Sequence, residues 1–205
     1  MCGYELIEVP FSHGELVNYN NIAQDCGVDA KTVKEYFQIL VDTLLGFYIE
    51  PYTKTRKRHI ITATPKFYLF DVGVAGRLSK RTLLSLEGAE AGKAFEHFMI
   101  TEVVAYRGLE EKDFAIRFWR EKSGLAVDLV LGEGEVTIEI KISRSVQPKD
   151  IRGLINFASD HKNARAIVVS QDPIARRLTL SGGVIVDILP WKQFLECLWC
   201  DKSIL

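Results

Sequence analysis

Residues 136–143, Val-Thr-Ile-Glu-Ile-Lys-Ile-Ser, alternate between apolar and polar side chains over one short segment. A period of two is typical of a β-strand, in which successive side chains point to opposite faces of the sheet. One face of this strand therefore carries Thr137, Glu139, Lys141 and Ser143. A carboxylate and an ammonium on a face that neighbouring strands help to bury are costly unless they are paired or bind a metal ion.

Two further acidic residues are predicted to lie close to Glu139 and Lys141. Asp128 interrupts the apolar strand 125–131, and a short turn between the strands brings it close to Glu139 and Lys141. Glu96, on a helix predicted over 92–108, can complete the cluster. Carboxylates and a backbone carbonyl, supplemented by water and a substrate phosphate, are the ligands that Mg²⁺ takes. We therefore predict the catalytic residues Glu96, Asp128, Glu139 and Lys141 and the Mg²⁺ or Mn²⁺ ligands Asp128, Glu139, Ile140 and Glu96.

Such a pocket would hydrolyse phosphodiester bonds. The metal would activate a bound water and neutralise charge on the attacked phosphate. Lys141 would position that water or stabilise the transition state electrostatically. The alternative is a structural salt bridge, in which Lys141 only neutralises Glu139 or Asp128.

The second half of the chain predicts the element order helix, three strands, helix, strand. The strands are 114–120, 125–131 and 136–143, followed by a helix over 150–161 and a strand over 165–170. The last strand is almost purely apolar, as expected at the buried centre of a sheet. An α/β (α+β) fold follows, with a mixed central sheet in residues 83–205.

The first half predicts a winged helix-turn-helix over residues 1–82. A short helix over 19–25 stops at Gly27, and Asp29 caps a second helix that runs to Leu45. The apolar positions of that helix follow amphipathic spacing: Val33, Phe37, Leu40, Val41, Leu44 and Leu45. Two extended runs, 46–52 and 58–70, would form the hairpin of the wing.

A local basic patch offsets the overall net charge of −1. Residues 50–81 hold eight Lys or Arg and two acids, and the wing tip is the most basic part. We predict nucleic-acid contacts by the second helix and the tip: Lys31, Lys34, Lys54, Arg56, Lys57 and Arg58. The alternative is a protein-binding winged helix, because Glu35 and Asp42 share the exposed face with those lysines.

Other sequence features indicate the cellular compartment and the roles of several isolated residues. No apolar run is long enough to span a membrane, no signal peptide begins the chain, and the four cysteines form no disulfide framework, so we expect a reducing cytoplasm. Cys197 and Cys200 are predicted as buried thiols on a C-terminal helix. His97, beside Glu96, is predicted as a surface residue, with the rim of the pocket as the alternative, and Asp71 as a helix cap or a turn residue after a strand. The C-terminal aromatic and leucine residues would be core or a contact surface: Trp191, Phe194, Leu195 and Trp199.

Two resemblances rest on these residues. Glu96, Asp128 and Glu139-Ile140-Lys141 resemble the PD-(D/E)xK nuclease superfamily, which includes restriction enzymes and Holliday-junction resolvases. The segments 65–78, 92–103, 118–131 and 138–141 resemble the C-terminal half of a prokaryotic AAA-type ATPase family, in which a winged helix precedes a nuclease-like domain of unknown function. The resemblance implies the two-domain organisation.

The same resemblance sets two expectations about function. No P-loop occurs in the sequence, so we expect no ATPase activity and interpret the chain as a fragment or a stand-alone remnant. Ala126 replaces an acid that the family often carries beside Asp128. The alternative to a DNA nuclease is therefore a catalytically inactive module that binds nucleic acid, a protein partner or a separate ATPase domain, with a homo-oligomer among the expected states.

Overall fold

Six α-helices and eight β-strands form in the part of the chain that the computed structural model describes, which confirms a mixed α/β composition. The described residues are 14–53, 64–80, 85, 87–161, 164–180, 183–201 and 203–204. The chain divides into two units, the first made of residues 1–50 and 62–98 and the second of residues 51–61 and 99–205. The division at residue 82 stays a prediction.

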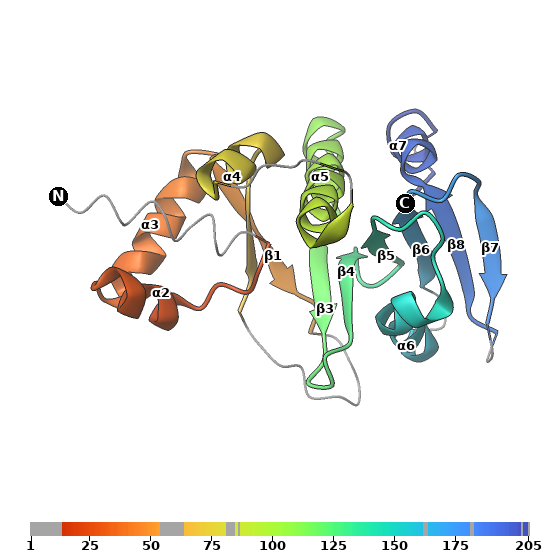
Figure 1. Ribbon diagram of the computed structural model, residues 1–205, viewed down its shortest axis with the longest axis horizontal. Coiled ribbons are helices and arrows are strands. Elements are labelled where there is room, and N and C mark those ends of the chain that lie inside the picture. Colours follow the sequence, from red (N-terminus) through yellow and green to blue (C-terminus); the bar gives the residue numbers. More distant parts are fainter. Residues whose placement is uncertain are drawn as a thin grey trace. The chain divides into compact units, whose positions relative to one another are not determined.

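Two helices joined by a tight turn lie near the start of the described part of the first unit (Figure 1). Helix α2 (Tyr19–Cys26) ends at Gly27, whose φ of 69° is the left-handed conformation that glycine adopts most readily. Helix α3 (Ala30–Asp42) begins after Asp29, whose Oδ1 accepts hydrogen bonds from the main-chain N–H groups of Lys31 and Thr32. Both the stop and the cap confirm the prediction.

Helix α3 ends three residues earlier than predicted. The N–H of Leu45 donates to the Leu40 carbonyl at 2.8 Å, and Leu44 takes a φ of 60°, the arrangement that closes many helices with a left-handed residue. Leu44 is 81% exposed, so its predicted inward position was wrong, as was that of Leu45. The physical reason is that the chain must reverse here into β1, which turns both leucines off the buried face.

The rest of the first unit packs a short hairpin against these helices. Strands β1 (Gly46–Pro51) and β2 (Lys66–Leu69) pair antiparallel, with Gly46 opposite Leu69. Helix α4 (Val72–Leu78) follows, and Asp71 caps it through the Val74 N–H, as predicted. The core of the unit centres on Phe37 of α3, whose ring meets that of Phe67 edge-on at 4.8 Å.

The second unit is built on a sheet in the order β3-β4-β5-β6-β8-β7. Its strands are β3 (Ile116–Arg120), β4 (Ala126–Leu131), β5 (Val136–Lys141), β6 (Arg165–Ser170), β7 (Arg176–Thr179) and β8 (Ile185–Pro190). Strands β5, β6 and β8 are mutually parallel, while β3, β4 and β7 pair antiparallel with their neighbours. The predicted mixed sheet and the buried central strand 165–170 are confirmed.

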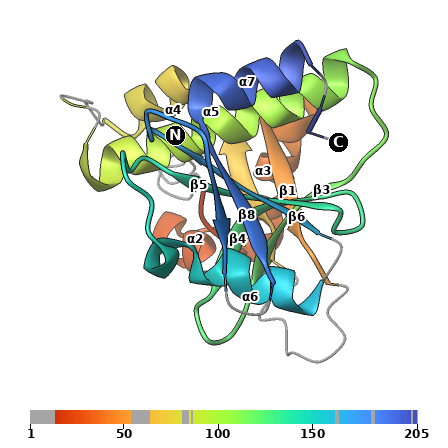
Figure 2. The same ribbon diagram turned by 90° about the vertical axis from the view of Figure 1, so that its right-hand side faces the viewer.

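Helices cover both faces of this sheet (Figure 2). Helix α6 (Arg152–Asp160), entered through a 3₁₀ turn (Pro148–Ile151), lies on one face. Helix α7 (Trp191–Trp199) lies on the other, beside the part of α5 (Gly88–Leu109) that belongs to this unit. The Trp199 Nε1–H donates to Glu102 Oε2 of α5 at 2.8 Å, which fixes these two helices side by side.

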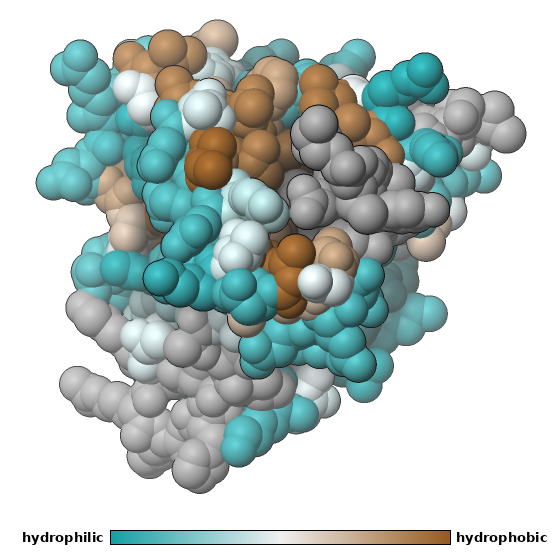
Figure 3. Space-filling model, turned by 90° about the vertical axis from the view of Figure 1, so that its left-hand side faces the viewer, coloured by the Kyte–Doolittle hydropathy of each residue, from teal (hydrophilic) through white to brown (hydrophobic). Residues whose placement is uncertain are grey.

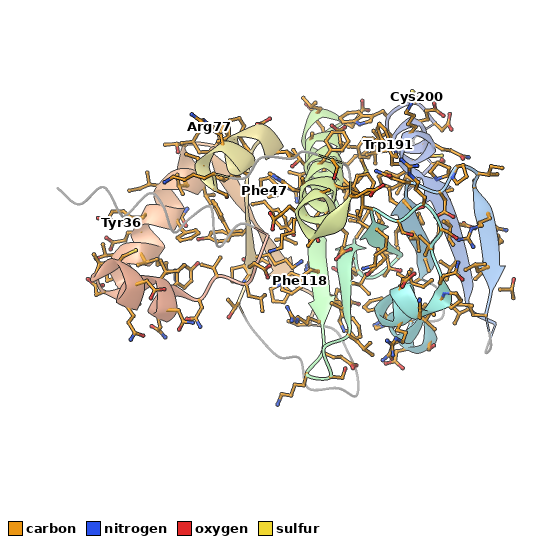
Figure 4. All side chains as sticks on the ribbon, viewed as in Figure 1. Tyr36, Phe47, Arg77, Phe118, Trp191 and Cys200 are labelled. Atoms are coloured by element: carbon orange, nitrogen blue, oxygen red, sulfur yellow. The ribbon has the colours of Figure 1, made fainter. Side chains whose placement is uncertain are left out.

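The C-terminal helix shows that the prediction for its cysteines was wrong, and it favours one of the two roles predicted for its aromatic and leucine residues. Trp191 and Cys200 mark its two ends (Figure 4), and Cys200 is exposed while Cys197 is half-buried, so the expected pair of buried thiols was wrong. Phe194 and Leu198 are fully buried, which favours a core role for this helix. Within the described residues, none of the helices combines the length and the apolar character needed to cross a bilayer.

Candidate functional site

Asp128 joins strands β4 and β5 with its side chain. In the antiparallel register of β4 and β5, Leu131 is opposite Val136 and Leu129 is opposite Ile138. The next residues along the two strands are Asp128 and Glu139. At this point Asp128 Oδ2 accepts a hydrogen bond from the Ile140 N–H at 2.8 Å. Beyond Leu129 and Ile138, this side-chain hydrogen bond replaces the main-chain pairing of the two strands. It holds the Asp128 carboxylate against the strand that carries Glu139 and Lys141.

Glu139 and Lys141 form an ion pair along β5. Lys141 Nζ lies 2.6 Å from Glu139 Oε1. The Glu139 side chain is only 7% exposed, whereas that of Lys141 is 35% exposed, so the carboxylate is buried and the ammonium reaches the rim. The structure therefore brings together four of the predicted residues: Asp128, Glu139, Ile140 and Lys141.

A second polar cluster, which the sequence reasoning missed, lies at the end of the neighbouring strand. Ser170 is opposite Lys141 in the parallel register of β5 and β6, and its hydroxyl donates to Asp172 Oδ2 at 2.9 Å. Asp172 is buried, accepts a bond from the Val146 N–H at 3.1 Å and pairs with Arg176 at 3.0 Å. This cluster ties the loop after β5 to the loop after β6.

A signal for this cluster was present in the sequence. Ser170 ends the largely apolar strand 165–170 and Asp172 lies just beyond it, and polar residues at the carboxyl ends of parallel strands gather at one edge of a sheet. The cluster holds the backbone immediately beyond Lys141, because the Gln171 N–H also donates to the Ser143 carbonyl at 3.0 Å.

The donor set suits a metal that is bound together with a phosphate. Among the described residues, three or more His, Cys, Asp or Glu side chains nowhere gather as a metal-binding group. The candidate site has two carboxylates, those of Asp128 and Glu139, together with the Ile140 carbonyl, and is therefore smaller than such a group. Mg²⁺ commonly uses one or two protein carboxylates and completes its shell with water and substrate phosphate oxygens, so these residues fit an ion of that kind.

Glu96 makes its contacts within the first unit. Its Oε1 accepts a hydrogen bond from the Tyr68 hydroxyl at 3.0 Å and lies 3.3 Å from Lys66 Nζ. Lys66 and Tyr68 both belong to β2, so this ion pair ties α5 to the hairpin of the first unit. Participation of Glu96 in the metal pocket stays a prediction.

His97 lies in the core of the first unit, so its predicted surface position was wrong. It is 1% exposed, and its Nε2 lies 2.7 Å from the Leu69 carbonyl oxygen. Its ring also packs near that of Tyr68, with 5.7 Å between centroids. The Leu69 carbonyl accepts a hydrogen bond from the buried N–H of the neutral imidazole, which allows this titratable ring to lie in the core.

His97 makes the first unit sensitive to mild acid. Burial lowers its pKa below the ordinary value of about 6.5, against smaller opposing effects of the Leu69 carbonyl, Asp71 and Glu96. As the pH falls through about 6.5 the unfolded chain takes up a proton before the folded one, so stability is present above that pH and is lost below it. We expect the free energy of unfolding to fall from pH 7.5 to pH 5.5 more steeply in the wild type than in His97→Gln, measured by urea denaturation. Parallel pH profiles would contradict this.

The predicted nucleic-acid residues fall into two groups. Lys31 and Lys34 are exposed on α3, where Lys31 Nζ lies 3.9 Å from Glu35 and Gln38 donates to Asp42. Both lysines line a hollow of about 500 Å³ beside the start of α2. The four tip residues Lys54, Arg56, Lys57 and Arg58 lie outside the described residues.

Comparison with known proteins finds a matching family model for each part of the chain. Residues 8–85 match a domain of unknown function, DUF8612, and residues 91–194 match a domain of unknown function, DUF4143. The latter is commonly found in AAA-ATPase-associated proteins, in loose agreement with the resemblance described above. Neither a curated protein nor a solved structure matches the chain. Because its match spans about half of the 205 residues, the chain belongs to the DUF4143 family.

Proposed function

We propose that the second unit is a restriction-endonuclease-like domain that hydrolyses DNA phosphodiester bonds with Mg²⁺ or Mn²⁺, and that the first unit is a winged helix that contacts the DNA. The observation that carries the proposal is the meeting of Asp128, Glu139 and Lys141 on two adjacent strands. The element order α5, β3, β4, β5, α6, β6 supports it, because it matches the order that the nuclease resemblance implies.

Each residue of the pocket has a chemical role in this proposal. Asp128, Glu139 and the Ile140 carbonyl hold the metal. The bound metal supplies an activated water and neutralises phosphate charge. Lys141, at the rim of the pocket, exchanges its contact with Glu139 for the phosphate and offsets the negative charge that develops in the transition state.

The first unit would supply affinity for the DNA backbone. The exposed Lys31 and Lys34 neutralise phosphates, and this contact is sequence-independent and weakens as salt rises. Together with a near-neutral overall charge, this favours local docking over long-range attraction to nucleic acid.

Calorimetry of Mg²⁺ and Mn²⁺ binding, combined with cleavage assays on linear and branched DNA, tests the proposal. We expect the wild type to bind the metal and cut DNA. Asp128→Asn removes one ligand charge at nearly constant volume, and we expect it to lower metal affinity at least tenfold, roughly the effect of disturbing a ligand or its support, and to abolish cleavage.

The matched control is Glu196→Gln, which removes one exposed carboxylate from α7, on the other face of the sheet from α6. It should bind metal and cut DNA as the wild type does. Absence of metal binding in the wild type, or equal loss in both variants, would refute the metal pocket and leave the Glu139–Lys141 pair as a structural salt bridge.

A protein- or nucleic-acid-binding module without catalysis is the second candidate. The supporting observation is that Tyr36 (labelled in Figure 4) and Ile39 are exposed on α3, and that Leu44, just past the end of this helix, is exposed as well. Hydrophobic side chains interrupt the hydrophilic surface on this side of the first unit (Figure 3). Exposed aliphatic residues on this helix are more typical of protein contact than of phosphate contact. Stoichiometric binding of DNA or protein without cleavage would favour this candidate.

A further inference from the structure

A cavity of about 690 Å³ lies in the second unit at the amino ends of the parallel strands. It is bounded by the last turns of α6, the start of β6, the edge strand β7 and its neighbour β8. Its size falls in the range of small-molecule sites, about 300–1,000 Å³. Because Lys141 lies at the carboxyl end of β5, this cavity is at the opposite end of the strands from the candidate nuclease site.

Two arginines converge on one carboxylate in the cavity wall. Arg177 Nε donates to Asp187 Oδ1 at 2.6 Å, and Arg165 Nε lies 3.8 Å from Asp187 Oδ2. Asp187 is 16% exposed, whereas Arg165 and Arg177 are 41% and 66% exposed. The group carries a net charge of +1. Asp187 holds the Arg177 guanidinium through a hydrogen bond to Nε, whereas Arg165 is held by the Ser203 carbonyl, which accepts a hydrogen bond from Nη1 at 2.6 Å.

The orientation of Arg177 leaves its terminal N–H groups for a ligand. The hydrogen bond to Asp187 uses the Nε–H of Arg177, so the N–H bonds of Nη1 and the outer N–H bond of Nη2, which point away from that edge of the guanidinium, take no part in it. The exposed side chain keeps these donors accessible to solvent. Such a fork matches the spacing of two oxygens of a phosphate or a carboxylate.

The rest of the cavity wall consists mostly of small or apolar residues. Ala158, Ala164 and Ala166 leave the space of the cavity, and Val184 and Ile185 line it with aliphatic surface. Ile185 is among the large hydrophobic residues that are exposed. A polar fork beside apolar surface is the composition of a site for a small molecule that has both characters.

We propose that this cavity binds a small ligand that carries an oxyanion, phosphate or carboxylate, on an apolar body. The oxyanion pairs with Arg177 and Arg165, and the body lies against the alanines and Ile185. This site is independent of the proposed nuclease function, because it shares no residue with the metal pocket. The alternative is a surface ion-pair network, which contributes little to stability and binds nothing.

Calorimetric titration of the full chain with phenyl phosphate, benzoate and inorganic phosphate tests the site. We expect one of the two aromatic anions to bind more tightly than inorganic phosphate, and the comparison between them identifies the preferred oxyanion. Arg177→Gln should weaken that binding about tenfold or more, as loss of a charge-assisted contact does. Arg152→Gln, at an exposed position of α6 away from the cavity, should leave binding unchanged.

A second variant tests the apolar half of the site. Ser159 is exposed at the cavity wall, and Ser159→Leu fills space there with a residue that helices favour. We expect it to abolish binding of the aromatic anion at an unchanged melting temperature. Equal affinity for all three anions, or binding that neither Arg177→Gln nor Ser159→Leu reduces, would overturn the proposal. So would the absence of binding at millimolar ligand.

Discussion

Lys141→Met is expected to destabilise the second unit by about 2–4 kcal/mol. Removing one partner of a buried ion pair leaves the other charge uncompensated, which costs about 3–5 kcal/mol for fully buried pairs. The Lys141 side chain is 35% exposed, so water screens part of the interaction and the cost is lower. Urea denaturation in a buffer without divalent cations measures the change.

The same variant separates the metal pocket from a plain salt bridge. If Glu139 is a metal ligand, Mg²⁺ or Mn²⁺ replaces the missing ammonium, and adding the metal should recover most of the lost stability while DNA cleavage stays absent. Lys122→Met, in the exposed turn between β3 and β4, is the control and should change stability by no more than about 0.5 kcal/mol. Loss of stability that the metal does not restore would identify the pair as purely structural.

Gly153→Ala is expected to destabilise the second unit by about 3 kcal/mol, although alanine is the better helix former. A Cβ atom at Gly153 would lie 1.9 Å from the carbonyl oxygen of Ala126 and 2.9 Å from its nitrogen. The obstacle is backbone of β4, which cannot move aside as a flexible side chain can. Overpacking of this kind costs about 1–3 kcal/mol and more where the backbone must shift, which exceeds the ~1 kcal/mol gained from helix propensity.

Gly108→Ala provides a control of opposite sign. Gly108 is also helical, in α5, but a Cβ there would meet nothing within 4 Å. We expect this variant to be more stable by about 0.5–1 kcal/mol, the usual gain from replacing a helical glycine. Thermal denaturation of both variants is sufficient, and similar shifts for the two would contradict the close approach of α6 to β4.

Most of the fold could be predicted from local patterns. The strand 165–170 was placed residue for residue, because an apolar run between polar segments has few alternatives. Asp29 was recognised as the cap before an amphipathic run, and Asp71, read as a cap or turn residue after a strand, is the cap of α4. The end of α3 was missed for a physical reason. Leu44 and Leu45 continue the helical period of apolar residues, and only the reversal into β1 places them outside the helix.

The candidate site was predictable only in part. Alternation along β5 placed Glu139 and Lys141 on one face, and their ion pair agrees with it. The hydrogen bond from Ile140 to Asp128 depends on the exact register of two strands, which a sequence pattern does not specify. Asp172 and His97 were missed because their partners, Arg176 with Val146 and the Leu69 carbonyl, are set by tertiary contacts.

Strand β5 pairs with β4, which precedes it in the sequence, and with β6, which follows it after a long connection. During synthesis, β5 can therefore pair with β4 before it pairs with β6. Only four residues separate its antiparallel partner β4 from β5, so Asp128 can reach Ile140 as soon as residue 141 has emerged. Its parallel partner β6 starts only at Arg165. Glu139 and Lys141 lie on the same strand and can pair in water, before β6 arrives to bury the carboxylate. The nascent chain therefore need not pass through a state in which that charge is desolvated alone.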